Sequence, residues 1–99
     1  MTVKVLLKRY VPKEKETELL GLIRALRTLT TKQPGYVTGE TYKRVDNPGE
    51  SLVISIWQSS SDWERWVSSM ERKVIQDQID GLLGTKTEYG VYEYVKSRL

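Results

Sequence analysis

The sequence predicts an α+β fold in which two helices cover one face of a four-stranded antiparallel sheet. Four segments rich in β-branched and aromatic residues alternate with two segments of helical periodicity, in the order β-α-β-β-α-β. Proline and glycine mark several of the boundaries between these segments. With 99 residues, the chain has room for one hydrophobic core. We therefore expect a single domain over residues 1–99 with the split βαβ, or ferredoxin-like, arrangement.

The first strand and the first helix are expected over residues 2–11 and 13–31. The strand segment is β-prone, and its apolar and basic side chains nearly alternate. Pro12 ends the strand and suits the first turn of a helix. The helix is indicated by apolar residues that recur every three or four positions, namely Leu19, Leu22, Ile23, Leu26 and Leu29.

A β-hairpin is expected after this helix. Gln33-Pro34-Gly35 breaks the helical pattern, and residues 36–45 and 51–58 read as strands. Pro48 and Gly49 between them fit the two central positions of a type II turn.

The second helix and the last strand complete the order. Ser61-Asp62-Trp63-Glu64 matches a capping box, and the helix is expected to run to about Asp80 with a break near Glu71. The final strand is expected over residues 85–96. Right-handed crossovers place both helices on the same face of the sheet. One face of the second helix is predicted to carry Trp63, Trp66, Val67, Met70 and Val74.

The uncovered face of the sheet is expected to form a dimer interface. The residues assigned beneath the helices are Val3, Val5, Leu7, Leu52, Ile54 and Ile56. The opposite face is assigned Leu6, Tyr10, Tyr36, Tyr42, Val53, Trp57, Tyr92 and Tyr94. An extensive apolar and aromatic face usually marks an interface. We therefore expect a sheet-to-sheet homodimer. The alternative is a partly solvated sheet, where tyrosine is also common.

The composition excludes many kinds of chemistry. The chain contains no Cys and no His, so disulfides, thiolate zinc sites, cysteine nucleophiles and histidine bases are impossible. Asp77 and Asp80 lie one helical turn apart without a third oxygen ligand nearby, so no metal is expected. Basic residues are interspersed with acidic ones, and the third strand lacks an RNA-recognition signature, so no nucleic acid partner is expected. The apolar runs are too short for a bilayer, which favours a cytoplasmic protein without a membrane partner.

Residues 34–70 carry the clearest family resemblance. They contain a Pro-Gly-aromatic strand start, an Asp-Asn-Pro turn, an aliphatic strand that ends in Trp, then serines and two tryptophans on a helix. This tract resembles the antibiotic biosynthesis monooxygenase (ABM) family. The resemblance implies a dimeric α/β barrel, a small organic ligand and, in some members, oxygenation of aromatic or quinol substrates without a cofactor. The related haem-degrading branch has Asn, Trp and His where this chain has Leu7, Trp66 and Gln76, so haem degradation is not expected.

The candidate pocket residues follow from the resemblance and from strand parity. Trp66 is the residue that this chain shares with the haem-degrading branch, and Trp63 lies on the same helix face; either side chain also fits a purely structural core role. Leu7 and Gln76 occupy the two positions that differ. Arg9 shares the helix-facing parity and could meet an anionic ligand, and Tyr89 could donate a hydrogen bond to a ligand oxygen.

Three functions are compatible with these features. The first is a cofactor-independent monooxygenase of the ABM type that acts on a small aromatic or quinol-like molecule. The second is a non-catalytic small-molecule-binding or regulatory dimer with the same fold. The third is an isomerase or another proton-transfer enzyme on the related dimeric barrel.

Overall fold

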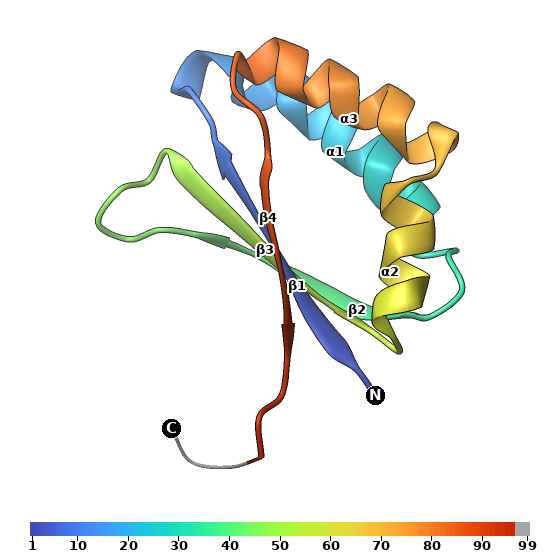
Figure 1. The fold of residues 1–99 in the computed structure, drawn as a ribbon. Coiled ribbons are helices and arrows are strands. Elements are labelled where there is room, and N and C mark those ends of the chain that lie inside the picture. The colour runs from blue at the N-terminus through green and yellow to red at the C-terminus, as the bar shows by residue number, and fades with distance from the viewer. Residues whose placement is uncertain (97–99) are drawn as a thin grey trace.

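The computed structural model describes residues 1–96, so the last three residues of the predicted domain lie outside the described part. The expected order of elements is confirmed, with the second helix divided into two (Figure 1). A short 3-10 helix, η1, also precedes the first helix. The elements are β1 (Val3–Tyr10), η1 (Lys13–Lys15), α1 (Glu16–Thr30), β2 (Tyr36–Lys43), β3 (Glu50–Trp57), α2 (Ser60–Val67), α3 (Met70–Leu83) and β4 (Glu88–Glu93).

The four strands form one antiparallel sheet in the order β2-β3-β1-β4. Leu7, near the middle of β1, pairs with Val53 on one side and with Tyr89 on the other. The helices lie against one face of this sheet, and no other part of residues 1–96 covers the opposite face (Figure 1). Within residues 1–96, no helix has both the length and the apolar character needed to cross a membrane.

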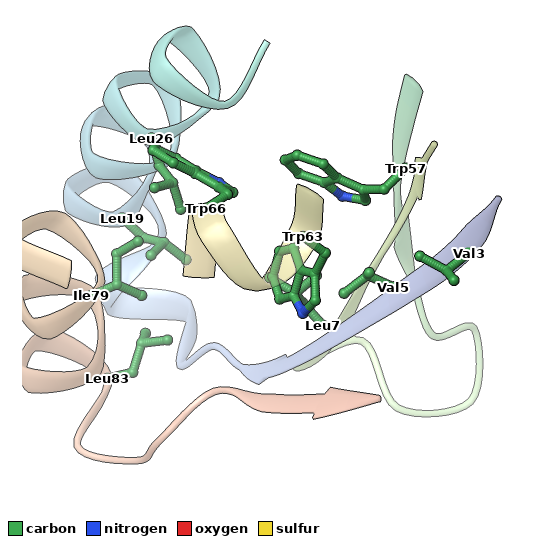
Figure 2. Close-up of a cluster of buried hydrophobic side chains, with 10 residues drawn as sticks. All are labelled: Val3, Val5, Leu7, Leu19, Leu26, Trp57, Trp63, Trp66, Ile79 and Leu83. Atoms are coloured by element: carbon green, nitrogen blue, oxygen red, sulfur yellow. The ribbon is translucent and has the colours of Figure 1, made fainter. Parts of the chain in front are cut away.

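The core lies between the sheet and the helices, as Figure 2 shows. Alternate residues of β1 supply its floor, as the sequence predicts, and all three tryptophans are buried in it. Its members are Val3, Val5, Leu7, Leu19, Leu26, Trp57, Trp63, Trp66, Ile79 and Leu83. Burial of these side chains is the main source of stability, because each large apolar side chain contributes roughly 1.5–3 kcal/mol.

The prediction of which β3 residues point towards the helices is wrong. Directly paired residues of antiparallel strands point to the same face, and Val3 pairs with Trp57. Trp57 therefore points beneath the helices, where it has no exposed surface and its Nε1 donates to Ser55 Oγ at 3.1 Å. Tyr36 accompanies it and packs edge-on against its ring at 5.4 Å between centroids. Both residues were expected on the uncovered face.

The cause of the error is that β3 is apolar on both faces. A shift of one residue in the pattern exchanges the two faces of a strand, and apolar residues on both sides give no signal against that shift. Consequently, Leu52, Ile54 and Ile56 lie on the uncovered face rather than in the core. Val53, which was expected on the uncovered face, instead lies on the face beneath the helices.

The uncovered face is more aliphatic than expected. Besides the three aliphatic residues of β3, it carries Leu6 from β1. The register also places Tyr10, Tyr42 and Tyr92 on this face, and all three are exposed. Tyr94, the remaining tyrosine of the predicted set, is exposed beyond the end of β4.

Serine caps define the two helices into which the predicted helix, expected to break near Glu71, is divided at Ser68-Ser69. Ser59 Oγ accepts from Asp62 N at 3.1 Å and begins α2 two residues before the predicted cap. Ser69 Oγ accepts from Arg72 N at 3.2 Å and begins α3. Because this break restarts the helical phase, Met70 and Val74 point outward, with 73% and 54% of their surfaces exposed. Their predicted place on the buried face is wrong.

Candidate small-molecule pocket

A pocket of about 430 Å³ lies between the sheet and the helices α1 and α2. Its floor is built by β1, β2 and β3, and it is roofed by α1. A second hollow of about 410 Å³ continues it towards the start of α1. The two hollows share Arg9, Ile23, Arg27, Thr41 and Val53, so they form one cleft beneath α1.

Aromatic rings form one end of the cleft. Tyr36, Trp57, Trp63 and Trp66 all line the first hollow. The ring centroids of Trp57 and Trp63 lie 5.6 Å apart in an edge-on arrangement, which is favourable for aromatic pairs. Figure 2 shows Trp57 projecting from the sheet, with Trp63 and Trp66 projecting from α2. The tryptophans therefore belong both to the core and to the wall of the cleft.

The charged residues that line the first hollow are all cations. They are Arg9 from β1, Arg27 from α1 and Arg72 from α3, and no Asp or Glu of the described residues 1–96 lines it. Arg27 lies at the exposed mouth, where its Nη2 donates to Thr41 Oγ1 at 3.4 Å. Arg9 and Arg72 are buried, with 4% and 3% of their surfaces exposed. The pocket is thus electropositive.

A network of neutral side chains holds the two buried arginines. Gln76 Oε1 accepts from Arg9 Nη2 at 3.1 Å and from Arg72 Nη2 at 3.4 Å. Arg9 Nε also donates to Thr87 Oγ1 at 3.2 Å. Gln76 Nε2 donates to Thr87 Oγ1 and to Asp80 Oδ1, each at 2.8 Å, and Thr87 Oγ1 donates to Asp80 Oδ1 at 2.9 Å. One amide side chain therefore joins two cations to a single carboxylate.

The carboxylate of Asp80 does not pair directly with either buried arginine. Within residues 1–96, no acidic side chain lies within ion-pair distance of Arg9 or Arg72. Burial lowers the pKa of Arg9; Tyr89 and Asp80 oppose this change, and the neighbouring Arg72 adds to it. Arg9 remains a cation at neutral pH because guanidinium is so strongly basic. Its charge is held in place but is only partly compensated.

Aromatic rings also hold Arg72. Its guanidinium carbon lies 5.4 Å from the ring centroid of Trp63 and 5.2 Å from that of Tyr89. Its Nη2 donates to Tyr89 Oη at 3.0 Å. Cation–π contacts of this kind stabilise a buried cation without supplying a negative charge.

The structure brings most of the predicted pocket residues together. Leu7, Arg9, Trp63 and Trp66 line the first hollow. Gln76 and Tyr89 do not line it; instead they lie behind the wall, in contact with the buried arginines.

Arg72 is the important residue that sequence reasoning missed. The signal was present in the spacing of α3, because Arg72 shares its buried face with Gln76, Ile79 and Leu83 at intervals of three and four residues. The helix break at Ser69 sets that phase, and the prediction put the break too late.

The fold and the cleft define a class of protein: small ferredoxin-like α+β domains with a ligand-sized pocket between helices and sheet. The family model for antibiotic biosynthesis monooxygenase matches residues 2–78. The chain belongs to this family. Among curated protein sequences, none matches this chain.

Solved structures show the same fold at low sequence identity. A conserved protein from Methanosarcina mazei is 24% identical with a TM-score of 0.83, covering 93% of this chain and 91% of that one. Rv0793 from Mycobacterium tuberculosis is 18% identical with a TM-score of 0.81, covering 98% of each chain. A variant of SnoaB, a cofactor-independent oxygenase from Streptomyces nogalater, is 14% identical with a TM-score of 0.82, covering 97% of this chain and 95% of that one.

Proposed function

We propose that this protein is a cofactor-independent monooxygenase that acts on a small aromatic or quinol-like molecule. The observation that carries the proposal is the first hollow of about 430 Å³, with three tryptophans and a tyrosine along its wall, in a member of the ABM family. Flat aromatic side chains suit a flat aromatic ligand. The oxygenase activity in the name of SnoaB supports the same reaction class.

The proposed reaction needs little from the protein beyond binding and orientation. An anthrone, for example, loses a proton from its central CH₂ group, and the resulting carbanion transfers one electron to O₂. The substrate radical and superoxide then combine to a peroxide, which loses water and leaves a carbonyl group. The net change is CH₂ plus O₂ to C=O plus H₂O. A cleft that holds the ring against Trp63 and Trp66 restricts its motion and displaces water around it.

The protein is also proposed to act as a homodimer through the uncovered face of the sheet. Leu6, Leu52, Ile54 and Ile56 form an aliphatic centre on that face, with exposed tyrosines among them. A contiguous apolar surface of this kind is typical of an interface. Two-fold pairing of the same face in each subunit would cover it.

Oxygen consumption with an anthrone or hydroquinone tests the oxygenase. We expect the substrate to be consumed faster with protein than without it, only when O₂ is present, and at the same rate after a chelator is added. Trp66→Ala should lower turnover, because Trp66 lines the cleft, whereas Arg24→Gln should not, because Arg24 is exposed and lines neither hollow. A panel of such substrates without any oxygen-dependent rate above background would contradict the proposal.

A binding or regulatory dimer is the second candidate. The observation in its favour is that no carboxylate lines the first hollow, in a chain that lacks His and Cys. Histidine, aspartate and glutamate, which often serve as a general base, are thus missing from the wall of the first hollow, where Tyr36 remains. Tight binding of an aromatic ligand without oxygen consumption would favour this function.

A further inference from the structure

The two buried arginines line the cleft and keep hydrogen-bond donors that have no partner among residues 1–96. A guanidinium has five N–H groups. Within residues 1–96, Nη1 of Arg9 makes no hydrogen bond, and neither do Nη1 and Nε of Arg72. In the same part of the chain, every fully enclosed side-chain nitrogen has a partner. These unpaired nitrogens are therefore not fully enclosed, and the cleft is the cavity that both side chains line.

Among residues 1–96, the charge of this wall has no counterpart in the first hollow, and Glu16 lines only the second hollow. Buried cations usually pair with a carboxylate, because removal from water is costly without one. Here the two guanidinium groups share a neutral acceptor, Gln76 Oε1, and Arg27 adds a third positive charge at the mouth. An anionic ligand would supply the missing negative charge where the free donors lie.

We propose that the cleft binds its aromatic ligand as an oxyanion, with the phenolate or enolate oxygen facing Arg9 and Arg72 and the ring against the tryptophans. The choice of oxygenase substrates rests on the proposed function, whereas the preference for an anion rests on the arginines alone. Both features lie in the same cleft: the donors come from β1 and α3, and Trp63 and Trp66 come from α2.

This arrangement explains how a substrate can lose its proton without a carboxylate in the first hollow. A hydroquinone, or the enol form of an anthrone, loses the proton of its O–H group, whereas a keto anthrone loses one from its CH₂ group. The proton passes to water at the mouth beside Arg27, and the electron pair is delocalised onto an oxygen that the arginines stabilise. Resonance carries this negative charge to the ring carbon that reacts with O₂. The arginines thus favour the electron-rich form of the substrate, the form from which an electron passes to O₂.

A nitrophenol tests the inference without turnover. p-Nitrophenol is coloured only as its phenolate, and its electron-poor ring resists oxidation. Titration of the bound ligand should give a pKa about one pH unit or more below that of the free phenol, because nearby cations lower an acid's pKa by roughly 1–3 units. The phenolate should accordingly bind at least tenfold more tightly than the phenol. Nitrobenzene, which has the ring but no acidic group, should bind equally well at every pH.

Matched variants assign the preference to the arginines. Arg9→Met and Arg72→Met should each lower the preference for phenolate over the neutral phenol about tenfold, and nitrobenzene binding measures any general change in the shape of the cleft. Arg24→Gln removes the same charge from an exposed site and should change neither. If circular dichroism shows that Arg9→Met is unfolded, Arg9→Lys keeps the charge and should retain most of the preference.

The outcomes separate this inference from the oxygenase. A bound pKa equal to or above that of the free phenol, or no detectable binding of either form, overturns the anion site. Equal preference in wild type and in both arginine variants also overturns it. A clear preference for phenolate in a protein that consumes no oxygen with any anthrone overturns only the oxygenase.

Discussion

Replacing Arg9 by methionine should leave the protein folded and at least as stable as the wild type. Arg9 is a buried cation whose two acceptors each keep another donor when it is removed. Gln76 Oε1 retains Arg72 Nη2 at 3.4 Å, and Thr87 Oγ1 retains Gln76 Nε2 at 2.8 Å. Methionine is unbranched and flexible, so it can follow the path of the arginine stem.

Two opposing contributions set the change in the free energy of unfolding that Arg9→Met causes. The variant loses two hydrogen bonds from a charged donor, each contributing about 1.5–3 kcal/mol. It also recovers the penalty for burying the cation, which is several kcal/mol per ion in proteins, and removes the repulsion from Arg72. These terms are of similar size. We expect the free energy of unfolding to rise by about 0–2 kcal/mol.

Gln76→Leu provides the contrasting change. It removes the acceptor that Arg9 and Arg72 share, so both buried cations lose a partner. Leaving a buried charged group unpaired typically costs about 3–5 kcal/mol. Urea unfolding of the two variants, compared at equal m-values, measures both effects. If Arg9→Met loses more than about 3 kcal/mol, or Gln76→Leu loses nothing, this reasoning about the buried charges is wrong.

Further changes test other parts of the structure. Ile54→Glu places a charge on the uncovered face and should halve the mass seen by sedimentation from about twice 11.5 kDa, while the fold measured by circular dichroism persists. Trp57→Glu buries an unpaired charge beneath the helices and should unfold the chain at any concentration. Trp66→Ala should cost about 3–5 kcal/mol in chemical denaturation as well as any activity. The hydrogen bond from Arg44 lowers the pKa of Asp46 from 3.8. The stabilisation from this pair is therefore present above pH 3.8 and is lost as the pH falls through the lowered pKa. NMR titration of Arg44→Gln should show the pKa of Asp46 return towards 3.8.

The elements that could be predicted from sequence were those whose two faces differ in polarity. On β1, basic residues at Lys4 and Lys8 mark the outer face, so the buried face could be assigned. On β3 both faces are apolar, and only the register with β1 decides which residues are buried. A local pattern contains no information about that register.

The candidate site shows the same limit. Arg9 could be placed on the helix-facing side because its strand alternates clearly. Arg72 could not, since its phase depends on a helix break at two consecutive serines, Ser68 and Ser69. The hydrogen bond between Arg9 and Gln76 joins residues that are 67 positions apart in the sequence, so it depends on tertiary packing.

The two-faced strand β3 has a consequence for how this domain can change. Its odd-numbered residues, Ser51, Val53, Ser55 and Trp57, line one or both hollows of the cleft, and its even-numbered residues lie on the uncovered face. The two sets can therefore be substituted independently, so ligand preference and subunit association can diverge separately through evolution. Insertion or deletion of a single residue within the strand would exchange the two sets. The length of β3 should consequently be far less tolerant of variation than its composition.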